Sequence, residues 1–249
     1  MFHFLLRQGY GGQVVSYFAK ATKDTSHGDP GKEKFKEGRI MKIIDISWPI
    51  SKATTGYKDR YVVAIDEVKN FNRDGVRETN IHLSSHSGTH VDAPSHFLKE
   101  GTTIDELHLD RVIGDCIVLD MTTCAERITR DCLLAHDNDI VEGGIVLFRT
   151  TNSDLSPTDK FSPHFVYLEA SGARYLAEKK VKAVGIDYLG IEHSQPGHPT
   201  HEALLQGDVT VIEGLRLGHV QAGKYFFVCL PLNMIGLEAA PARAILMKQ

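Results

Sequence analysis

The eleven-residue segment from His86 to His96, His-Ser-Gly-Thr-His-Val-Asp-Ala-Pro-Ser-His, constrains the fold and the chemistry of this chain more than any other feature. It places three histidines and Asp92 at even offsets. Side chains of an extended strand alternate between its two faces, so all four groups can project to the same side. A helix would scatter them because its period is 3.6 residues, and Gly88 and Pro94 disfavour one.

A straight strand would still separate His86 and His90 by roughly 13 Å, too far for both to bind one ion. Gly88 lies between them and permits a bend, because it has no Cβ. We therefore expect a bent strand end that offers two imidazoles and the Asp92 carboxylate, which are ligands typical of zinc and manganese. Four ordinary polar loop residues would not explain the shared face and the glycine between them.

Composition narrows the class of protein. The 249 residues can form one full core, the net charge is −4, and no run of Lys and Arg indicates a nucleic-acid partner. No apolar stretch reaches the length of a membrane span, so we expect no membrane partner. The four cysteines show no Cys-x-x-Cys spacing and predict free thiols in a reducing cytoplasm.

The first forty residues differ from the rest of the chain. Residues 1–20 contain no acidic residue, and 24–38 are polar and rich in lysine and glycine. We interpret residues 1–40 as a disordered or non-native extension, because the apolar run at 4–6 is too short for a secretory signal. A single domain is predicted over 41–249, with a strand directly after Met41.

Short strand-like runs then alternate with helical ones, which predicts an α/β fold with a mixed β-sheet and flanking helices. Predicted strands are Lys42–Ser47, Tyr61–Val68, Thr79–Ser84, Asp115–Met121, Ile145–Arg149, Ala183–Asp187, Val209–Ile212 and Tyr225–Leu230. Predicted helices are Thr129–His136, with Thr129 as its cap, about Tyr167–Lys180, and His201–Leu205. Asn152–Pro163 is predicted to be an exposed loop.

Two residues further along the chain are candidates to complete a metal site. His201 opens a helical stretch, and Glu213 shares a strand face with apolar residues such as Val211. A carboxylate in that position is either exposed at the strand end or buried with a cation, because a bare buried charge is very costly. Glu202 is a rival carboxylate beside His201.

These motifs together resemble the metal-dependent cyclase family, which includes bacterial kynurenine formamidase (arylformamidase) and isatin hydrolase. The likeness rests on the eleven-residue motif, on His201 and Glu213 twelve residues apart, and on the flanking segments Asp45-Ile-Ser47, Gly185-Ile-Asp187 and Glu238-Ala-Ala-Pro241-Ala-Arg243. It spans nearly everything from Met41 onward. The resemblance implies a swivelling-type α/β domain, usually a homodimer.

The resemblance also implies roles for the site residues. His86, His90 and Asp92 would bind a first ion, and Asp92 would bridge to a second ion held by His201 and Glu213. The cofactor would be Zn²⁺ or Mn²⁺, with one or two ions per chain. His96 matches the family's catalytic acid/base, and its ordinary pKa near 6.5 suits proton transfer in both directions. His96 as a further ligand or as a support for the ligands is the alternative.

One segment departs from the family pattern. Bacterial kynurenine formamidases carry Trp-Pro-Gly-Asp soon after the first strand, and that tryptophan lines the substrate pocket. This chain has Tyr57-Lys-Asp there, while its only tryptophan is Trp48. Tyr57 and Trp48 are therefore the candidates for an aromatic substrate wall, with Trp48 in the core as the alternative. The departure weakens the expectation of formylkynurenine as substrate.

The function expected is metal-dependent hydrolysis of an amide, formamide or lactam C–N bond outside peptides, in a small aromatic substrate. The expected activity resembles that of kynurenine formamidase, which releases formate and kynurenine from N-formylkynurenine in tryptophan catabolism. Isatin hydrolase-like ring opening with a single manganese is the nearest alternative, and a polyketide-type cyclase or dehydratase a more distant one. A metal-holding protein that binds a small ligand without turnover is a different class, disfavoured by His96. A structural metal is disfavoured because no cysteine lies in the cluster.

Overall fold

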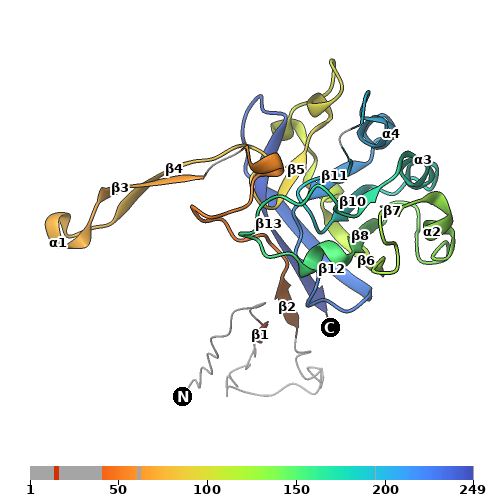
Figure 1. Cartoon of the computed structure of the whole chain (residues 1–249), viewed down its shortest axis with the longest axis horizontal. Coiled ribbons are helices and arrows are strands. Elements are labelled where there is room, and N and C mark those ends of the chain that lie inside the picture. The colour runs from red at the N-terminus through yellow and green to blue at the C-terminus, as the bar shows by residue number, and fades with distance from the viewer. Residues whose placement is uncertain (1–13, 17–40, 61–62, 194, 249) are drawn as a thin grey trace, which may run out of the picture.

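The computed structural model describes residues 14–16, 41–60, 63–193 and 195–248 (Figure 1). The extension predicted over 1–40 therefore lies outside the described residues, apart from 14–16. The strands are β1 (Val14–Ser16), β2 (Lys42–Asp45), β3 (Ala64–Lys69), β4 (Glu78–His82), β5 (His90–Asp92), β6 (Ile113–Asp120), β7 (Arg127–Ile128), β8 (Ile145–Arg149), β9 (Tyr167–Leu168), β10 (Ala183–Ile186), β11 (Thr210–Glu213), β12 (Gly223–Pro231) and β13 (Ala239–Lys248).

The helices are short. The α-helices are α1 (Phe71–Asp74), α2 (Arg130–Leu134), α3 (Ala170–Glu178) and α4 (Pro199–Gln206), and the 3-10 helices are η1 (Tyr57–Asp59), η2 (Pro94–His96), η3 (Ile104–Glu106), η4 (Leu109–Arg111) and η5 (Thr151–Asp154). Within the described ranges, every helix is too short or too polar to cross a membrane.

The main sheet closes on itself. Its strand order is β1-β2-β13-β12-β6-β8-β10-β11-β5, and β5 also pairs with the start of β13, which completes a ring from β13 round to β5. The β6-β8-β10-β11 pairs are parallel and the remaining pairs are antiparallel. The predicted mixed α/β sheet is confirmed, in the form of a closed, barrel-like sheet with few helices.

Alternating side chains build two cores from the same strands. In β8, Ile145 and Leu147 join the cluster that fills the barrel, whereas Val146 and Phe148 join a second cluster. That second cluster includes Leu176 of α3 and thus lies between the sheet and its helices. Both faces of β8 are buried, which explains why its sequence is a continuous apolar run.

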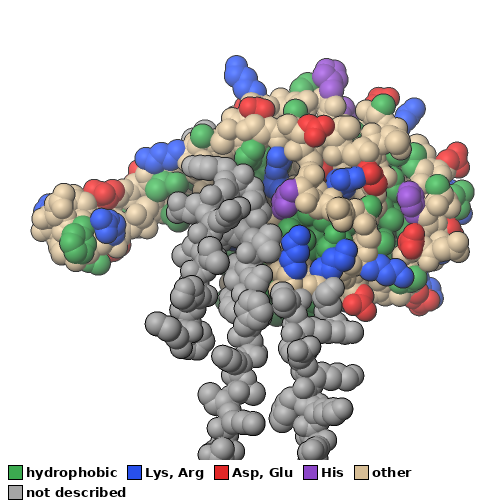
Figure 2. All heavy atoms as spheres, turned by 90° about the horizontal axis from the view of Figure 1, so that it is seen from below, with side chains coloured by type: hydrophobic (Ala, Val, Ile, Leu, Met, Phe, Trp, Pro, Cys, Tyr) green, Lys and Arg blue, Asp and Glu red, His purple; other side chains and the backbone are tan. Residues whose placement is uncertain are grey.

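An arm formed by β3, α1 and β4 extends away from the barrel (Figure 1). The arm stands clear of the body in the perpendicular view as well (Figure 2). β3 and β4 pair only with each other among the described strands, and the apolar arm residues Phe71, Val76 and Ile81 are about half exposed or more. A two-stranded hairpin has marginal stability in water by itself. The arm therefore has an unburied apolar surface.

Two predictions from the sequence differ from the structure. The helix predicted from about Tyr167 begins only at Ala170, because Tyr167–Leu168 pairs with β7 and the Glu169 side chain caps the helix. Asn152–Pro163 is not wholly an exposed loop, since Asn152 is buried and hydrogen-bonds the backbone of Val166 through both side-chain polar atoms. In addition, strand β13 (Ala239–Lys248) was not predicted from the sequence.

Candidate metal centre

The chain bends sharply between His86 and His90, at the glycine expected to permit it. Gly88 has φ +63°, a left-handed conformation that a residue with a Cβ adopts only at a cost. A Cβ there would also lie 3.1 Å from Ile50 Cγ1. The bend brings the two imidazole rings to a centroid separation of 4.9 Å. A straight strand could not bring them this close.

The short strand β5 sets the direction of the next two groups. Val91 points into the barrel core, so the alternation of the strand turns His90 and Asp92 to the opposite face. β5 lies between β11 and β13, and His90 is directly opposite Glu213 in the antiparallel register. Side chains opposite each other in such a pair share a face, so Glu213 joins the two β5 groups.

A second glycine allows β11 to end close to the bend. Gly214 has φ +70°, and a Cβ on it would lie 2.2 Å from the Gly88 carbonyl oxygen. The Thr89 hydroxyl donates to the Gly214 carbonyl at 2.5 Å across this contact. Glu213 is thereby held beside the histidine bend rather than exposed at a strand end, and only 5% of its surface is accessible.

Hydrogen bonds determine which ring nitrogen of two histidines faces the carboxylates. Nδ1–H of His90 donates to the Gly88 carbonyl at 2.9 Å, and Nδ1–H of His201 donates to Glu192 Oε2 at 2.7 Å. Each ring therefore presents Nε2 to the cluster. Nε2 of His90 lies 3.3 Å from Glu213 Oε2, and Nε2 of His201 lies 3.4 Å from Glu213 Oε1.

Asp92 lies at the centre of this cluster. Its Oδ1 is 3.1 Å from His86 Nδ1 and 3.6 Å from His90 Nε2, and its Oδ2 is 3.8 Å from His201 Nε2. One carboxylate thus faces three imidazoles that come from the bend, from β5 and from α4. Asp92 is therefore the carboxylate that the imidazoles of the cluster share.

The cluster favours positive charge. Burial lowers the pKa of His90, but attraction to Glu213 and Asp92 outweighs burial and raises it to about 9. Burial likewise lowers the pKa of His201, whereas Glu192, Glu213 and Asp92 together raise it to about 10. The pKa of Glu213 lies well below its ordinary value because His201 and His90 outweigh the effect of its burial. Two buried carboxylates here require a proton or a metal cation for neutralisation.

Buried polar atoms that lack hydrogen-bond partners favour a metal cation over a proton at this site. Among the described residues, His90 Nε2 and both carboxylate oxygens of Asp92 are buried without a hydrogen-bond partner. Buried polar atoms normally have partners, and leaving them without costs about 1–3 kcal/mol each. Ligand atoms of His90, Asp92 and Glu213 lie within 4.8 Å of one another, as do those of His86, Asp92 and His96. Imidazole nitrogens and carboxylate oxygens at these spacings fit a divalent transition-metal ion.

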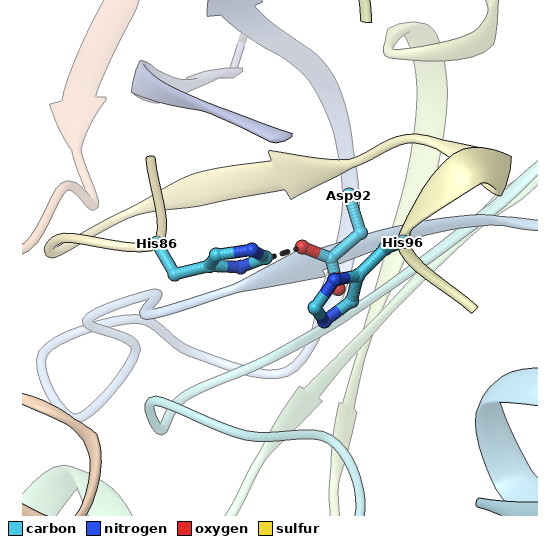
Figure 3. A group of neighbouring side chains, drawn as sticks. All are labelled: His86, Asp92 and His96. Atoms are coloured by element: carbon cyan, nitrogen blue, oxygen red, sulfur yellow. Dashed lines mark ion pairs between the residues drawn. The ribbon is translucent and has the colours of Figure 1, made fainter. Parts of the chain in front are cut away.

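His96 reaches the same group from η2, immediately after β5. Figure 3 shows the His86 and His96 rings on two sides of the Asp92 carboxylate, with the ion pair between His86 and Asp92 drawn as a dashed line. The His86 and His96 ring centroids are 4.3 Å apart. Burial lowers the pKa of His96 below its ordinary value, so its imidazole is largely uncharged near neutral pH.

A cavity of about 330 Å³ opens beside the cluster and is lined in part by His86, His96, His201 and Glu213. Tyr57 also lines this cavity. Trp48 does not line it. Trp48 is 2% exposed, donates its indole N–H to the Pro157 carbonyl and packs near Tyr188 in an aromatic cluster of the core.

Sequence reasoning missed two carboxylates at this site. Glu192 is buried and accepts hydrogen bonds from both Nδ1 and the backbone N–H of His201. Glu238 lies 3.3 Å from His86 Nε2 and accepts from Ser85. Glu238 stands in one of the segments that carry the family resemblance, which was its only signal in the sequence, whereas Glu192 stands in no such motif and only the fold brings it to His201. Glu202, the rival to Glu213, lies exposed on α4.

A bent strand, a buried set of imidazoles and carboxylates, and an adjoining cavity define a candidate metal centre of the hydrolase type within a closed α/β sheet. The family model described as putative cyclase matches residues 44–193. The chain belongs to this family.

Relatives and solved structures agree with that assignment. Kynurenine formamidase of Salinibacter ruber is 34% identical over 83% of this chain and 97% of that protein. The structure of a predicted metal-dependent hydrolase from Bacillus stearothermophilus is 42% identical, with a TM-score of 0.74 over 84% of this chain and 99% of that one. Isatin hydrolase A of Labrenzia aggregata shares the fold, with a TM-score of 0.72 at 22% identity over 83% of this chain and 93% of that one.

Proposed function

We propose that this protein is a metal-dependent hydrolase of amide, formamide or lactam C–N bonds outside peptides, acting on a small aromatic substrate. The observation that carries the proposal is the set of buried polar atoms without hydrogen-bond partners, His90 Nε2 and both oxygens of Asp92, beside a cavity large enough for a small ring. The similarity to kynurenine formamidase of Salinibacter ruber supports the bond type.

The proposed ligand set is the one that the family resemblance implies, and the structure brings all five residues into one cluster. His86, His90 and Asp92 would hold a first ion, and Asp92 would bridge to a second ion held by His201 and Glu213. The ion would be Zn²⁺ or Mn²⁺, one or two per chain, since both metals accept imidazole and carboxylate ligands. Such an ion polarises a carbonyl and lowers the pKa of bound water from about 15.7 to about 7.

His96 is the proposed proton-transfer residue. It lines the cavity next to the ligands, and its uncharged imidazole can accept a proton and deliver it to the leaving nitrogen. The Phe97 ring lies 4.1 Å from the His96 ring and 4.3 Å from the His201 ring, measured between centroids. This apolar ring limits the access of bulk water to the histidines.

A screen with three substrate types tests the proposal. The protein is loaded with zinc or with manganese, its metal is counted by elemental analysis, and it is assayed with N-formylkynurenine, isatin and simple aryl amides. Hydrolysis of at least one substrate, abolished by a chelator and restored by metal, is the expected result. Isatin opening with one manganese per chain would favour the isatin hydrolase-like alternative. Tight binding without any product would favour a ligand-binding protein.

We extend the proposal to a cytoplasmic homodimer whose catalytic domain spans residues 41–249. All four cysteines are free, which suits a reducing compartment. The arm exposes Phe71 and Ile81, at 56% and 60% of their surface, and a second copy of the chain is the partner we assign to this surface.

A further inference from the structure

The outer part of the cavity beside the metal centre is lined by side chains that the proposed chemistry does not use. They are Tyr57, Lys58 and Arg60 from the η1 turn, and His193 and His198 from the segment before α4. Phe97 completes an aromatic wall with Tyr57. The cavity lining therefore combines apolar rings, which suit an aromatic substrate, with two basic side chains.

The charged side chains of the η1 turn differ in whether they line the cavity. Lys58 and Asp59 both have positive φ, at 53° and 55°, a rare conformation for residues other than glycine. Asp59 does not line the cavity; its Oδ1 accepts a hydrogen bond from the backbone N–H of Phe161 at 2.9 Å. Lys58 and Arg60, on either side of Asp59, do line it. The turn thus directs its two cations to the cavity and its carboxylate elsewhere.

Neighbouring residues pack against the η1 turn and fix its position. The Tyr57 ring packs against the Phe161 ring at a centroid distance of 4.8 Å, and a Cβ on Gly190 would lie 3.1 Å from Tyr57 Cε2. The Lys58 ammonium lies 5.3 Å from the centroid of the Tyr57 ring. Contacts of η1 with the 161 loop and with Gly190 hold the turn over the cavity.

The carboxylates that line the cavity are engaged with groups other than Arg60. Glu192 is bound to His201, and Glu213 accepts from the Ile191 N–H while facing His90 and His201. Arg60 forms no ion pair with any other residue that the structure describes. Its guanidinium therefore remains available to an anion that enters the cavity.

We propose that Arg60, assisted by Lys58, selects substrates that carry an anionic group, such as a carboxylate on the same aromatic ring as the amide that is cleaved. This inference rests on the proposed hydrolase function and specifies its substrate class. A guanidinium binds a carboxylate through two parallel N–H···O bonds, and the ring would lie between Tyr57 and Phe97. The neighbouring cations would also attract an anionic substrate to the cavity before it binds.

A matched pair of substrates tests the selection. 3-Formamidobenzoate and 3-formamidobenzamide have the same ring, the same formamide and nearly the same shape, but only the first is charged. The metal-loaded full-length protein is expected to favour the carboxylate by about tenfold or more in kcat/KM. Arg60→Gln should reduce this preference about tenfold, mainly through the KM of the carboxylate. Arg174→Gln, which changes an exposed arginine on α3 away from the cavity, should keep the preference.

The outcomes separate this inference from the proposed function. Equal kcat/KM for the two substrates, or an equal loss for both in Arg60→Gln, would overturn the inference and leave the hydrolase assignment standing. Failure to cleave either compound would count against the hydrolase assignment. In that case calorimetric binding of 3-aminobenzoate and 3-aminobenzamide decides: a preference for the anion that Arg60→Gln abolishes supports the inference, and equal affinities contradict it.

Discussion

His90 and Glu213 face each other across β5 and β11, with His90 Nε2 3.3 Å from Glu213 Oε2. Two left-handed glycines make this pairing possible, because Gly88 bends the chain before His90 and Gly214 turns it directly after Glu213. His90 donates through Nδ1 to the Gly88 carbonyl, so the same bend also orients its ring. The backbone bend at Gly88 therefore both positions the proposed ligand His90 and orients its ring.

Glu192 is expected to strengthen metal binding without touching the ion. It accepts from Nδ1–H of His201 at 2.7 Å and so directs Nε2 to the cluster. Glu192→Gln should weaken metal affinity about 10- to 100-fold, as is usual for carboxylates that orient a metal-binding histidine. Competition with a chromophoric chelator measures this affinity. Glu202→Gln, on the exposed face of α4, is the matched control, and equal affinities in the two variants would refute the role.

His96→Ala should keep its metal and lose most of its turnover. Removal of a proton-transfer group typically reduces kcat about 10²- to 10⁴-fold. Elemental analysis and steady-state rates are measured on the same preparation, with His164→Ala, which removes an exposed histidine, as control. If the His96 variant lost bound metal instead, His96 would be a ligand.

Gly214→Ala should damage both stability and the metal centre. The left-handed conformation costs an alanine about 1–2 kcal/mol, and its Cβ would also lie 2.2 Å from the Gly88 carbonyl oxygen. Gly143 has the same φ of +70°, but a Cβ there would meet no atom within 4 Å, so Gly143→Ala carries only the first cost. Thermal unfolding should show the larger loss for Gly214→Ala, together with reduced metal content. Equal losses would mean that the close approach to Gly88 is unimportant.

Asp187 should make the free energy of unfolding decrease as the pH rises through the acidic range. It is fully buried, and burial raises its pKa from 3.8 to about 6, against the effect of hydrogen bonds from Thr150 and Ser153. The unfolded chain therefore releases this proton at a lower pH than the folded protein does. The contribution of Asp187 to the free energy of unfolding falls as pH rises from about 4 to about 6 and is constant above, by about 3 kcal/mol at most.

Urea unfolding of the wild type and of Asp187→Asn across pH 4–7 isolates this contribution. The difference in unfolding free energy, wild type minus variant, should decrease through that window. A difference that increases with pH would show that the hydrogen bonds from Thr150 and Ser153 outweigh burial.

Shortening the arm should yield monomers. Ile65 pairs with Ile81, so residues 66–80 can be replaced by Asn-Gly, which favours a tight hairpin turn. Light scattering should then give the mass of one shortened chain, whereas the intact protein should give twice the 27.6 kDa of one full chain. Phe71→Ser, a milder change on the same arm, should weaken the dimer. An intact protein that is monomeric at micromolar concentration would contradict the assignment.

The elements of this fold that depend on local sequence signals could be predicted from the sequence. Strand β8 and the Thr129 cap of α2 lie where predicted, because their apolar run and their capping side chain are local signals. β13 was missed because Ala239-Ala-Pro-Ala-Arg243 has low strand propensity, and its place follows from pairing with β12, β5 and β2. The bend at Gly88 was predictable from spacing alone. The contact of Glu192 with His201 was not predictable, because only the packing of α4 brings His201 close to Glu192.

The location of the ion in diffraction data tests the central claim most directly. Crystals of protein prepared with zinc or manganese, measured at the absorption edge of the metal, should show an anomalous peak about 2.0–2.2 Å from His90 Nε2 and from an Asp92 oxygen, with His86 as a further ligand. A second peak near His201 and Glu213 would define a two-metal centre. No peak among these residues, with the Asp92 oxygens bonded to water instead, would contradict the account.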